Sequence, residues 1–362
     1  MHPFDVVVRV LAERLAGGTP SEALRAALAG DAVSWERMVE QASEQFVLAA
    51  FAAALRDLDL VPGLEPEVGQ FLHAVHSANA ERNARLRRQL TEILSTLNQT
   101  GIEPVLLKGA IRLADQLYPD PGWRMMQDLD VLVPKAKLKN AVWALRKDGY
   151  VIAPGPHRHS SPDAHHHYPG LVHPERCAPV ELHTRLFPPI RTRLLLEAGE
   201  VLEHAQPMRV DGTRTRLPSL EHQMIHLIGH CQIAHYGHIY GRIELRDRLE
   251  AAALVRWSSG TLAWERILAR FAVVGYRRPM LTFLLSLRDG GLCTVPAPAR
   301  IDGVTALQAW RVAMQARSAT AMRLGRDAAL LKEEMLERGA GWRTVLGMLV
   351  RRLTGGQAAS PR

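Results

Sequence analysis

The sequence predicts an α+β fold in which a small mixed sheet with flanking helices lies between two helical regions. Three observations predict this fold. Apolar residues recur at helical spacing through residues 1–100, short apolar runs typical of strands follow within residues 101–217, and helical spacing returns across residues 218–340. Residues 341–362 are basic, and we expect a partly disordered tail there.

The N-terminal region is expected to contain several consecutive helices. Helical patterns cover residues 34–45, 46–58 and 65–98. The second and third patterns are separated by a Val-Pro-Gly break, and Gly101 follows the third, where glycine commonly ends a helix.

The central region begins with the order strand, glycine turn, helix. The apolar run at residues 105–107 ends at Lys108 and Gly109, and a helix is expected over residues 110–118, beginning at Ala110 and stopped by nearby prolines. Gly109 is expected to let the backbone come close to a ligand. The following helix would present free N–H groups to a phosphate.

Two aspartates follow this turn along the chain. Asp128 and Asp130 lead into the apolar run at residues 131–133, and alternation along a strand turns both to one face. At about 3.3 Å per residue they would lie roughly 7 Å apart and repel each other. A divalent ion removes this repulsion, and Mg²⁺ or Mn²⁺ binds carboxylates together with substrate phosphates. A phosphate turn and a metal-binding Asp-x-Asp pair on adjacent strands indicate nucleotidyl transfer.

The rest of the central region predicts further strands around a crossover helix. The helix is expected over residues 135–148, a strand starts at residues 150–152, and residues 208–217 contain an Asp-Gly hairpin signal. Between them, Glu181 and His183 alternate on a strand and share one face, so His183 would flank a metal site or orient Glu181.

A histidine-rich loop separates two of these strands. Residues 155–176 hold six histidines among proline, serine and glycine, without the spacing of a structural zinc site. Three roles stay open for this loop: a surface decoration, a lid over the substrate, or a metal site.

The C-terminal region predicts a helix from Ser219 that carries histidines at intervals of four residues. His222, His226 and His230 therefore share one face, either as core residues or as a catalytic or metal-binding stripe. Further helices are expected over the four ranges 242–256, 263–274, 278–287 and 304–338.

Composition restricts the partners of the protein. A net charge of +8 is compatible with nucleotides, nucleic acid or anionic lipid, but aromatic residues make up only 6%, which disfavours a base-stacking platform for nucleic acid. Three widely separated cysteines fit a reducing compartment. The N-terminus has neither the basic start nor the long apolar core of a signal peptide or a membrane span. We therefore expect a cytoplasmic protein.

The chain resembles the polymerase β-like nucleotidyltransferase superfamily and, within it, a bacterial group described as uncharacterised nucleotidyltransferases. The resemblance covers roughly residues 100–290. The motifs that carry it are LLKGA at 106–110, LYPDPGWR at 117–124, DLDVLV at 128–133 and VELH at 180–183. Many superfamily members have Gly-Ser in the turn, whereas this chain has Lys108 before the glycine and Ala110 after it.

The resemblance implies a nucleotidyltransferase core and assigns roles to its residues. Asp128, Asp130 and Glu181 would be the catalytic acids and hold a pair of divalent ions. The turn at Lys108, Gly109 and Ala110 would bind the nucleotide. Lys108 and Arg124 would neutralise the leaving pyrophosphate; the alternative for Arg124 is a structural tie between its loop and the strand at Asp130. Arg246 and Asp247 would face the site as a pair, and the alternative is an ordinary surface ion pair.

The donor would be a nucleoside triphosphate, with ATP as the default, and the acceptor a small molecule, a peptide or a protein. Nucleic acid is not expected as the acceptor. Two alternatives remain at this point. One is a non-catalytic nucleotide-binding or scaffold protein, and the other is a glycosyltransferase whose Asp-x-Asp pair binds a sugar nucleotide.

Overall fold

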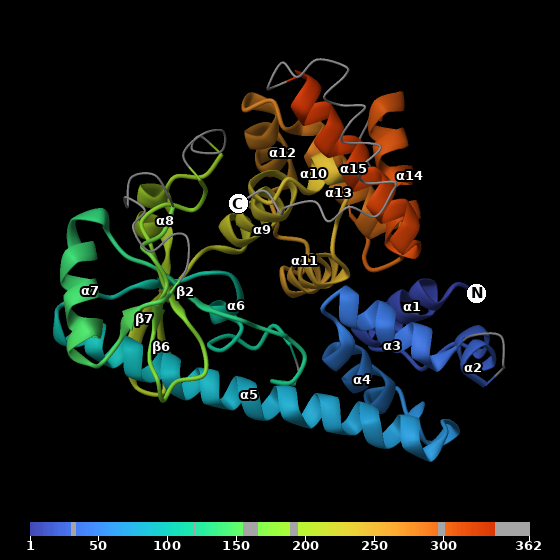
Figure 1. The fold of residues 1–362 in the computed structure, drawn as a ribbon, viewed down its shortest axis with the longest axis horizontal. Coiled ribbons are helices and arrows are strands. Elements are labelled where there is room, and N and C mark those ends of the chain that lie inside the picture. The colour runs from blue at the N-terminus through green and yellow to red at the C-terminus, as the bar shows by residue number, and fades with distance from the viewer. Residues whose placement is uncertain (30–33, 119, 155–165, 189–194, 296–300, 337–362) are drawn as a thin grey trace.

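The computed structural model has a mixed sheet on one side and helical layers on the other, joined by one long helix (Figure 1). The structure describes residues 1–29, 34–118, 120–154, 166–188, 195–295 and 301–336. The fold class expected from the sequence is confirmed, because a seven-stranded mixed sheet is flanked by helices that precede and follow it in the chain.

Helices form the N-terminal region as expected. They are α1 (Pro3–Ala16), α2 (Glu22–Ala29), α3 (Trp35–Glu44), α4 (Leu48–Asp57) and α5 (Pro66–Gln99). Two of them have side-chain N-caps that satisfy an orphan N–H: the Ser34 side chain accepts from the Arg37 N–H in α3, and the His2 side chain from the Phe4 N–H in α1.

The sheet has the strand order β3-β4-β5-β2-β1-β7-β6. β2 lies parallel to β5, β1 is antiparallel to β2, and β1 is parallel to β7. The strands are β1 (Val105–Leu106), β2 (Leu129–Leu132), β3 (Val151–Ile152), β4 (Leu171–Val172), β5 (Val180–His183), β6 (Gln206–Val210) and β7 (Thr213–Leu217). The hairpin predicted near Asp211 is the β6–β7 pair.

The helix predicted over residues 110–118 is wrong in both position and length. The observed helix, α6 (Lys108–Ile111), has four residues, and tighter turns follow it. The Leu113 N–H donates to the carbonyl three residues back, and the Asp115 carboxylate accepts the Leu117 N–H and pairs with Arg112. These local contacts therefore take the place of the backbone hydrogen bonds that would have continued the helix.

The C-terminal region is helical, with one difference from expectation. The segment expected as one helix over 304–338 is two helices separated at Ser318, whose backbone is extended. Two helices lie between strands of the sheet, α7 (Leu138–Lys147) and α8 (Ala198–His204). The helices of the C-terminal region are α9 (Leu220–Gly229), α10 (Gly237–Tyr240), α11 (Leu245–Trp257), α12 (Trp264–Val273), α13 (Arg277–Asp289), α14 (Gly303–Arg317) and α15 (Ala319–Leu336). None of the described helices combines the length and apolar character needed to cross a membrane.

Buried apolar residues form two clusters, and α5 contributes to both. One cluster covers the sheet and includes Leu86, Leu90 and Leu97 from the second half of α5. The other joins the N-terminal helices to α9, α11 and α13 and includes Leu72 from the first half. Figure 1 shows α5 running beneath both the sheet and the N-terminal helices. The predicted boundary at residue 100, between the N-terminal helical region and the sheet region, stays a prediction. Because α5 packs against both the N-terminal helices and the sheet, it connects the two regions.

Candidate active site

The turn after β1 is held by packing within the protein. Gly109 lines a cavity, but a Cβ atom on it would lie 2.8 Å from Met126 Cγ, so its missing side chain makes room for Met126. The left-handed backbone is taken by Lys108, at φ +48°, a region that non-glycine residues rarely adopt. Ala110 is buried and its N–H donates to the Leu107 carbonyl at 3.0 Å, so we do not include Ala110 in the nucleotide site.

The strand register brings two of the predicted acids together. In the parallel pair of β2 and β5, Asp130 lies opposite Glu181 and Leu132 lies opposite His183. His183 Nε2 is 2.7 Å from Asp130 Oδ1 and 3.4 Å from Glu181 Oε2. Asp128 precedes β2 and lines the same cavity as Glu181. We call Asp128, Asp130 and Glu181 the acidic cluster.

Asp130 is fully buried, Asp128 and Glu181 are half-buried, and few cations balance the acidic cluster. Lys108 Nζ lies 2.8 Å from Asp130 Oδ1. Burial would raise the pKa of Asp130, but Lys108 and His183 outweigh it and hold that pKa well below its usual range. Burial, and then repulsion from Asp130, raise the pKa of Asp128 to about 6. The cluster therefore carries more negative charge than its protein neighbours neutralise.

The residues of this cluster fit a divalent ion. Among the described residues, Asp130, Glu181 and His183 offer ligand atoms that all lie within 4.8 Å of one another. Asp130 Oδ2 is buried and has no hydrogen-bond partner in the described part of the chain. A bound cation would satisfy the unmatched oxygen of Asp130 and reduce the repulsion between Asp128 and Asp130.

The histidine-rich loop supplies two residues to the site that the sequence did not single out. The backbone of His166 and His167 runs along β5: the Thr184 N–H donates to the His166 carbonyl, and His167 forms a bridge with His183. Both rings lie within 5.3 Å of the His183 ring, centroid to centroid, and line the cavity. His157, His159 and His165 lie outside the described residues.

The histidines predicted on α9 face the same cavity from the helical side. His222, His226 and His230 all line it, although His222 also lies 3.3 Å from a Glu200 carboxylate oxygen. Burial lowers the pKa of His226 to about 3, and its Nε2 has no hydrogen-bond partner among the described residues. These rings are therefore neutral near pH 7.

Two arginines and one glutamate form a second buried charged group, the arginine cluster. Glu250 on α11 pairs with Arg124 at 2.8 Å and with Arg112 at 3.2 Å. Burial would raise the pKa of Glu250, but the two arginines outweigh it and hold the carboxylate ionised. Arg124 was expected to meet pyrophosphate; in the structure it lines the cavity already paired with Glu250.

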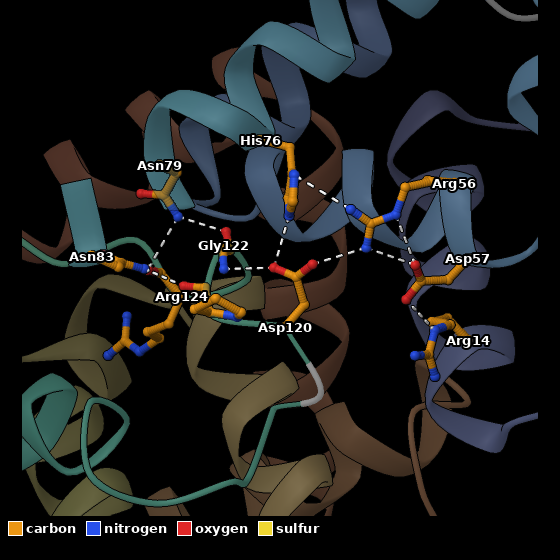
Figure 2. A network of polar contacts seen from close by, with 10 residues as sticks. Arg14, Arg56, Asp57, His76, Asn79, Asn83, Asp120, Gly122 and Arg124 are labelled. Carbon is orange, nitrogen blue, oxygen red and sulfur yellow. Dashed lines mark hydrogen bonds and ion pairs between the residues drawn. The ribbon is translucent and has the colours of Figure 1, made fainter. Parts of the chain in front are cut away.

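Side chains of the N-terminal helices fix the loop that leads to Asp128 (Figure 2). On α5, Asn83 Nδ2 donates to the Arg124 carbonyl at 2.8 Å, and Asn79 Nδ2 donates to the Gly122 carbonyl at 2.6 Å. His76 Nε2 lies 2.8 Å from Asp120 Oδ1. A Cβ atom on Gly122 would lie 2.5 Å from the His76 ring. These contacts give a physical reason for Asp120 and Gly122 in this loop.

The acidic and arginine clusters face one cavity of about 350 Å³. Lys108, Arg246 and Asp247 also line it, so the structure brings all the predicted site residues except Ala110, Asp130 and His183 to its walls. Asp130 and His183 are fully buried beside Glu181 in the sheet, the first on the neighbouring strand and the second two residues further along the same strand. Sequence reasoning missed Arg112 and Glu250, because no local motif marks two residues that meet only through the fold.

Residues 31–289 match the model of a family described as uncharacterised nucleotidyltransferase. The match spans well over half of the chain, so the protein belongs to this nucleotidyltransferase family. No curated protein and no solved structure matches the chain. The family assignment supports nucleotidyl transfer over the scaffold and glycosyltransferase alternatives.

Proposed function

We propose that this nucleotidyltransferase transfers a nucleoside monophosphate from a nucleoside triphosphate, ATP by default, to a hydroxyl group of a small molecule, peptide or protein. The acceptor oxygen forms a bond to the α-phosphorus, the bond from that phosphorus to the bridging oxygen breaks, and pyrophosphate leaves with the electron pair. The hydroxyl proton leaves to solvent. The three unpaired cysteines and the absence of a membrane-crossing helix among the described residues fit our proposal that it works in the cytoplasm.

The chain's own residues bind and orient the donor. Lys108 would contact the phosphates, because its ammonium group lies 2.8 Å from Asp130 Oδ1 and the residue lines the cavity. Burial would lower the pKa of Lys108, but the acids outweigh it, so the group stays charged. Arg112 and Arg124 lie across the cavity, where their guanidinium groups are held by Glu250 and, for Arg112, also by Asp115, and present N–H donors to a phosphate.

Asp128, Asp130 and Glu181 would hold Mg²⁺ or Mn²⁺, with His183 against two of them. When bound, a divalent ion supplies Lewis-acid stabilisation of phosphoryl charge. The observation that carries this proposal is the register of β2 and β5, which sets Asp130 directly beside Glu181.

The test is to incubate the protein with each labelled nucleoside triphosphate, Mg²⁺ or Mn²⁺, and candidate acceptors. Pyrophosphate release together with a nucleotide-sized mass increase on the acceptor is expected. Nucleotide binding without pyrophosphate release, from any donor and with either metal, would instead indicate a non-catalytic protein.

A further inference from the structure

We call the cavity that the acidic and arginine clusters face the catalytic cavity. A second cavity, of about 390 Å³, adjoins it on the side of the C-terminal helices. His230, His235, Arg246 and Asp247 line both cavities, so the two spaces meet at these residues. The outer wall of the second cavity comes from α15 and from the chain around α10. A ligand held there would have one end at the junction with the acidic site.

The wall between the two cavities is built from unusual backbone. The π-helical turn η3 (His230–Ala234) interrupts the regular helix, and Tyr236 adopts a left-handed φ of +56°. A Cβ atom on Gly237 would lie 2.4 Å from the Cys231 carbonyl oxygen, and the buried Gln232 side chain donates to the Arg242 carbonyl. π-turns and strained residues concentrate at functional sites. This wall is therefore closely packed and shaped by specific contacts.

The second cavity is rich in arginine. Four arginines line it, against two carboxylates: the arginines are Arg242, Arg246, Arg323 and Arg326, and the carboxylates are Glu244 and Asp247. Glu244 is paired with Arg242 at 3.0 Å and with Arg246 at 2.9 Å. Arg246 also pairs with Asp247, and Arg326 lies 3.7 Å from an Asp327 carboxylate oxygen, whereas no acidic side chain in the described part of the chain pairs with Arg323. The surplus positive charge of the cavity therefore lies at Arg323.

The two cavities differ in the ligand chemistry they offer. Both cavities have apolar lining, from Leu107, Met126 and Leu227 in the catalytic cavity and from Tyr240 and Met322 in the second, but Asp128 and Glu181 of the acidic cluster line the catalytic cavity and not the second. The second cavity offers guanidinium groups, which bind carboxylate and phosphate oxygens through paired hydrogen bonds. The donor with its metal therefore fits the first cavity, and an anionic group of a second substrate fits the second.

We infer that the second cavity binds the acceptor, and that the acceptor is a small molecule carrying a carboxylate or phosphate group close to its nucleophilic hydroxyl. This inference rests on the proposed function. Arg323 and Arg326 would hold the anionic group, while the hydroxyl would reach the catalytic cavity past His230. A cavity of this size admits a small molecule or the end of a longer chain.

The experiment compares the full-length protein with the double variant Arg323→Ala/Arg326→Ala. The probes are sn-glycerol 3-phosphate, D-glycerate and the uncharged analogue glycerol, and binding is followed by calorimetry with and without Mg²⁺ and a non-hydrolysable ATP analogue. We expect at least one anionic probe to bind the wild type and to lose affinity about tenfold or more in the double variant. Glycerol should not bind. Arg288→Ala, on the exposed end of α13, is the matched control and should behave as wild type.

The affinity of the ATP analogue separates the possible outcomes. It should be unchanged in the double variant if the cavity serves the acceptor. A loss of analogue affinity would show that the cavity holds part of the donor, and would overturn the inference. Equal binding of the anionic probes to the wild type and the double variant, or no binding to either, would also overturn it. If the analogue fails to bind even the wild type, the proposed function fails, and the probe titrations without it still test anion binding.

Discussion

The acidic cluster and the arginine cluster face the same cavity but differ in how far their charges are neutralised by neighbouring side chains. Asp128, Asp130 and Glu181 share Lys108 and His183 as cationic neighbours, whereas the two arginines have two carboxylates, Glu250 between them and Asp115 beside Arg112. The first group therefore has surplus negative charge, whereas the charges of the second are matched. The acidic cluster is suited to bind a cation, and the arginine cluster is suited to present fixed guanidinium donors to phosphate without collapsing onto the acids.

The largest expected effect comes from the acidic side. Asp128→Asn removes a carboxylate whose pKa is raised by burial and by repulsion from Asp130, and with it part of the metal site. We expect turnover to fall about 1,000-fold, about 4 kcal/mol in the activation barrier, with little change in folding. Pyrophosphate release measures it. The matched control, Asp289→Asn at an exposed position, should retain full activity, and an active Asp128→Asn enzyme would remove this residue from the mechanism.

The next largest effect is expected from removing the Glu250 carboxylate from the arginine cluster. Glu250→Gln leaves the buried Arg124 guanidinium group without its counter-charge and Arg112 with Asp115 alone, so we expect the free energy of unfolding to fall by about 3 kcal/mol. Denaturant unfolding measures the change. Glu103→Gln is the control, because its partner Arg214 forms an exposed pair that contributes under about 1 kcal/mol. Equal losses in the two variants would show that burial does not distinguish these pairs.

The third effect concerns the neutral histidines between the clusters. The pKa of His226 is about 3 in the folded protein, below its value of about 6.5 when unfolded, so the unfolded chain takes up the proton first. Stability should therefore fall as the pH falls from about 6.5 toward 3, by about 2 kcal/mol at pH 5 for this residue. Unfolding at several pH values should show a shallower pH dependence in His226→Gln. The exposed variant His204→Gln should keep the wild-type slope, and an unchanged slope in His226→Gln would contradict the assignment.

The smallest expected effect comes from replacing Gly109 in the turn after β1. Gly109→Ala forces the Met126 side chain to shift, and we expect a loss of about 1 kcal/mol in stability with nucleotide affinity retained. Thermal unfolding and nucleotide titration measure the two quantities. Unchanged stability with weakened nucleotide binding would support the role that the sequence first indicated for this glycine, which is close approach to the ligand.

The sequence predicted the acidic side of the site better than the basic side, and the reason is physical. Asp128, Asp130 and Glu181 lie on or beside strands, and alternation along a strand fixes which residues share a face. The pairing of Arg124 with Glu250 joins residues far apart in the chain and depends on how α11 packs. The short α6 was also missed, because its end is set by side-chain contacts of Arg112 and Asp115 that helical spacing does not reveal.

Helix α5 limits how far the chain can be shortened. Its second half supplies Leu86 and Leu97 to the sheet, and its middle holds the loop before Asp128 through Asn79 and Asn83. A fragment starting at Gly101 would keep every predicted catalytic acid yet expose the apolar underside of the sheet and release that loop. The smallest active unit should therefore include the helix that precedes the first strand, even though none of its side chains takes part in the proposed chemistry.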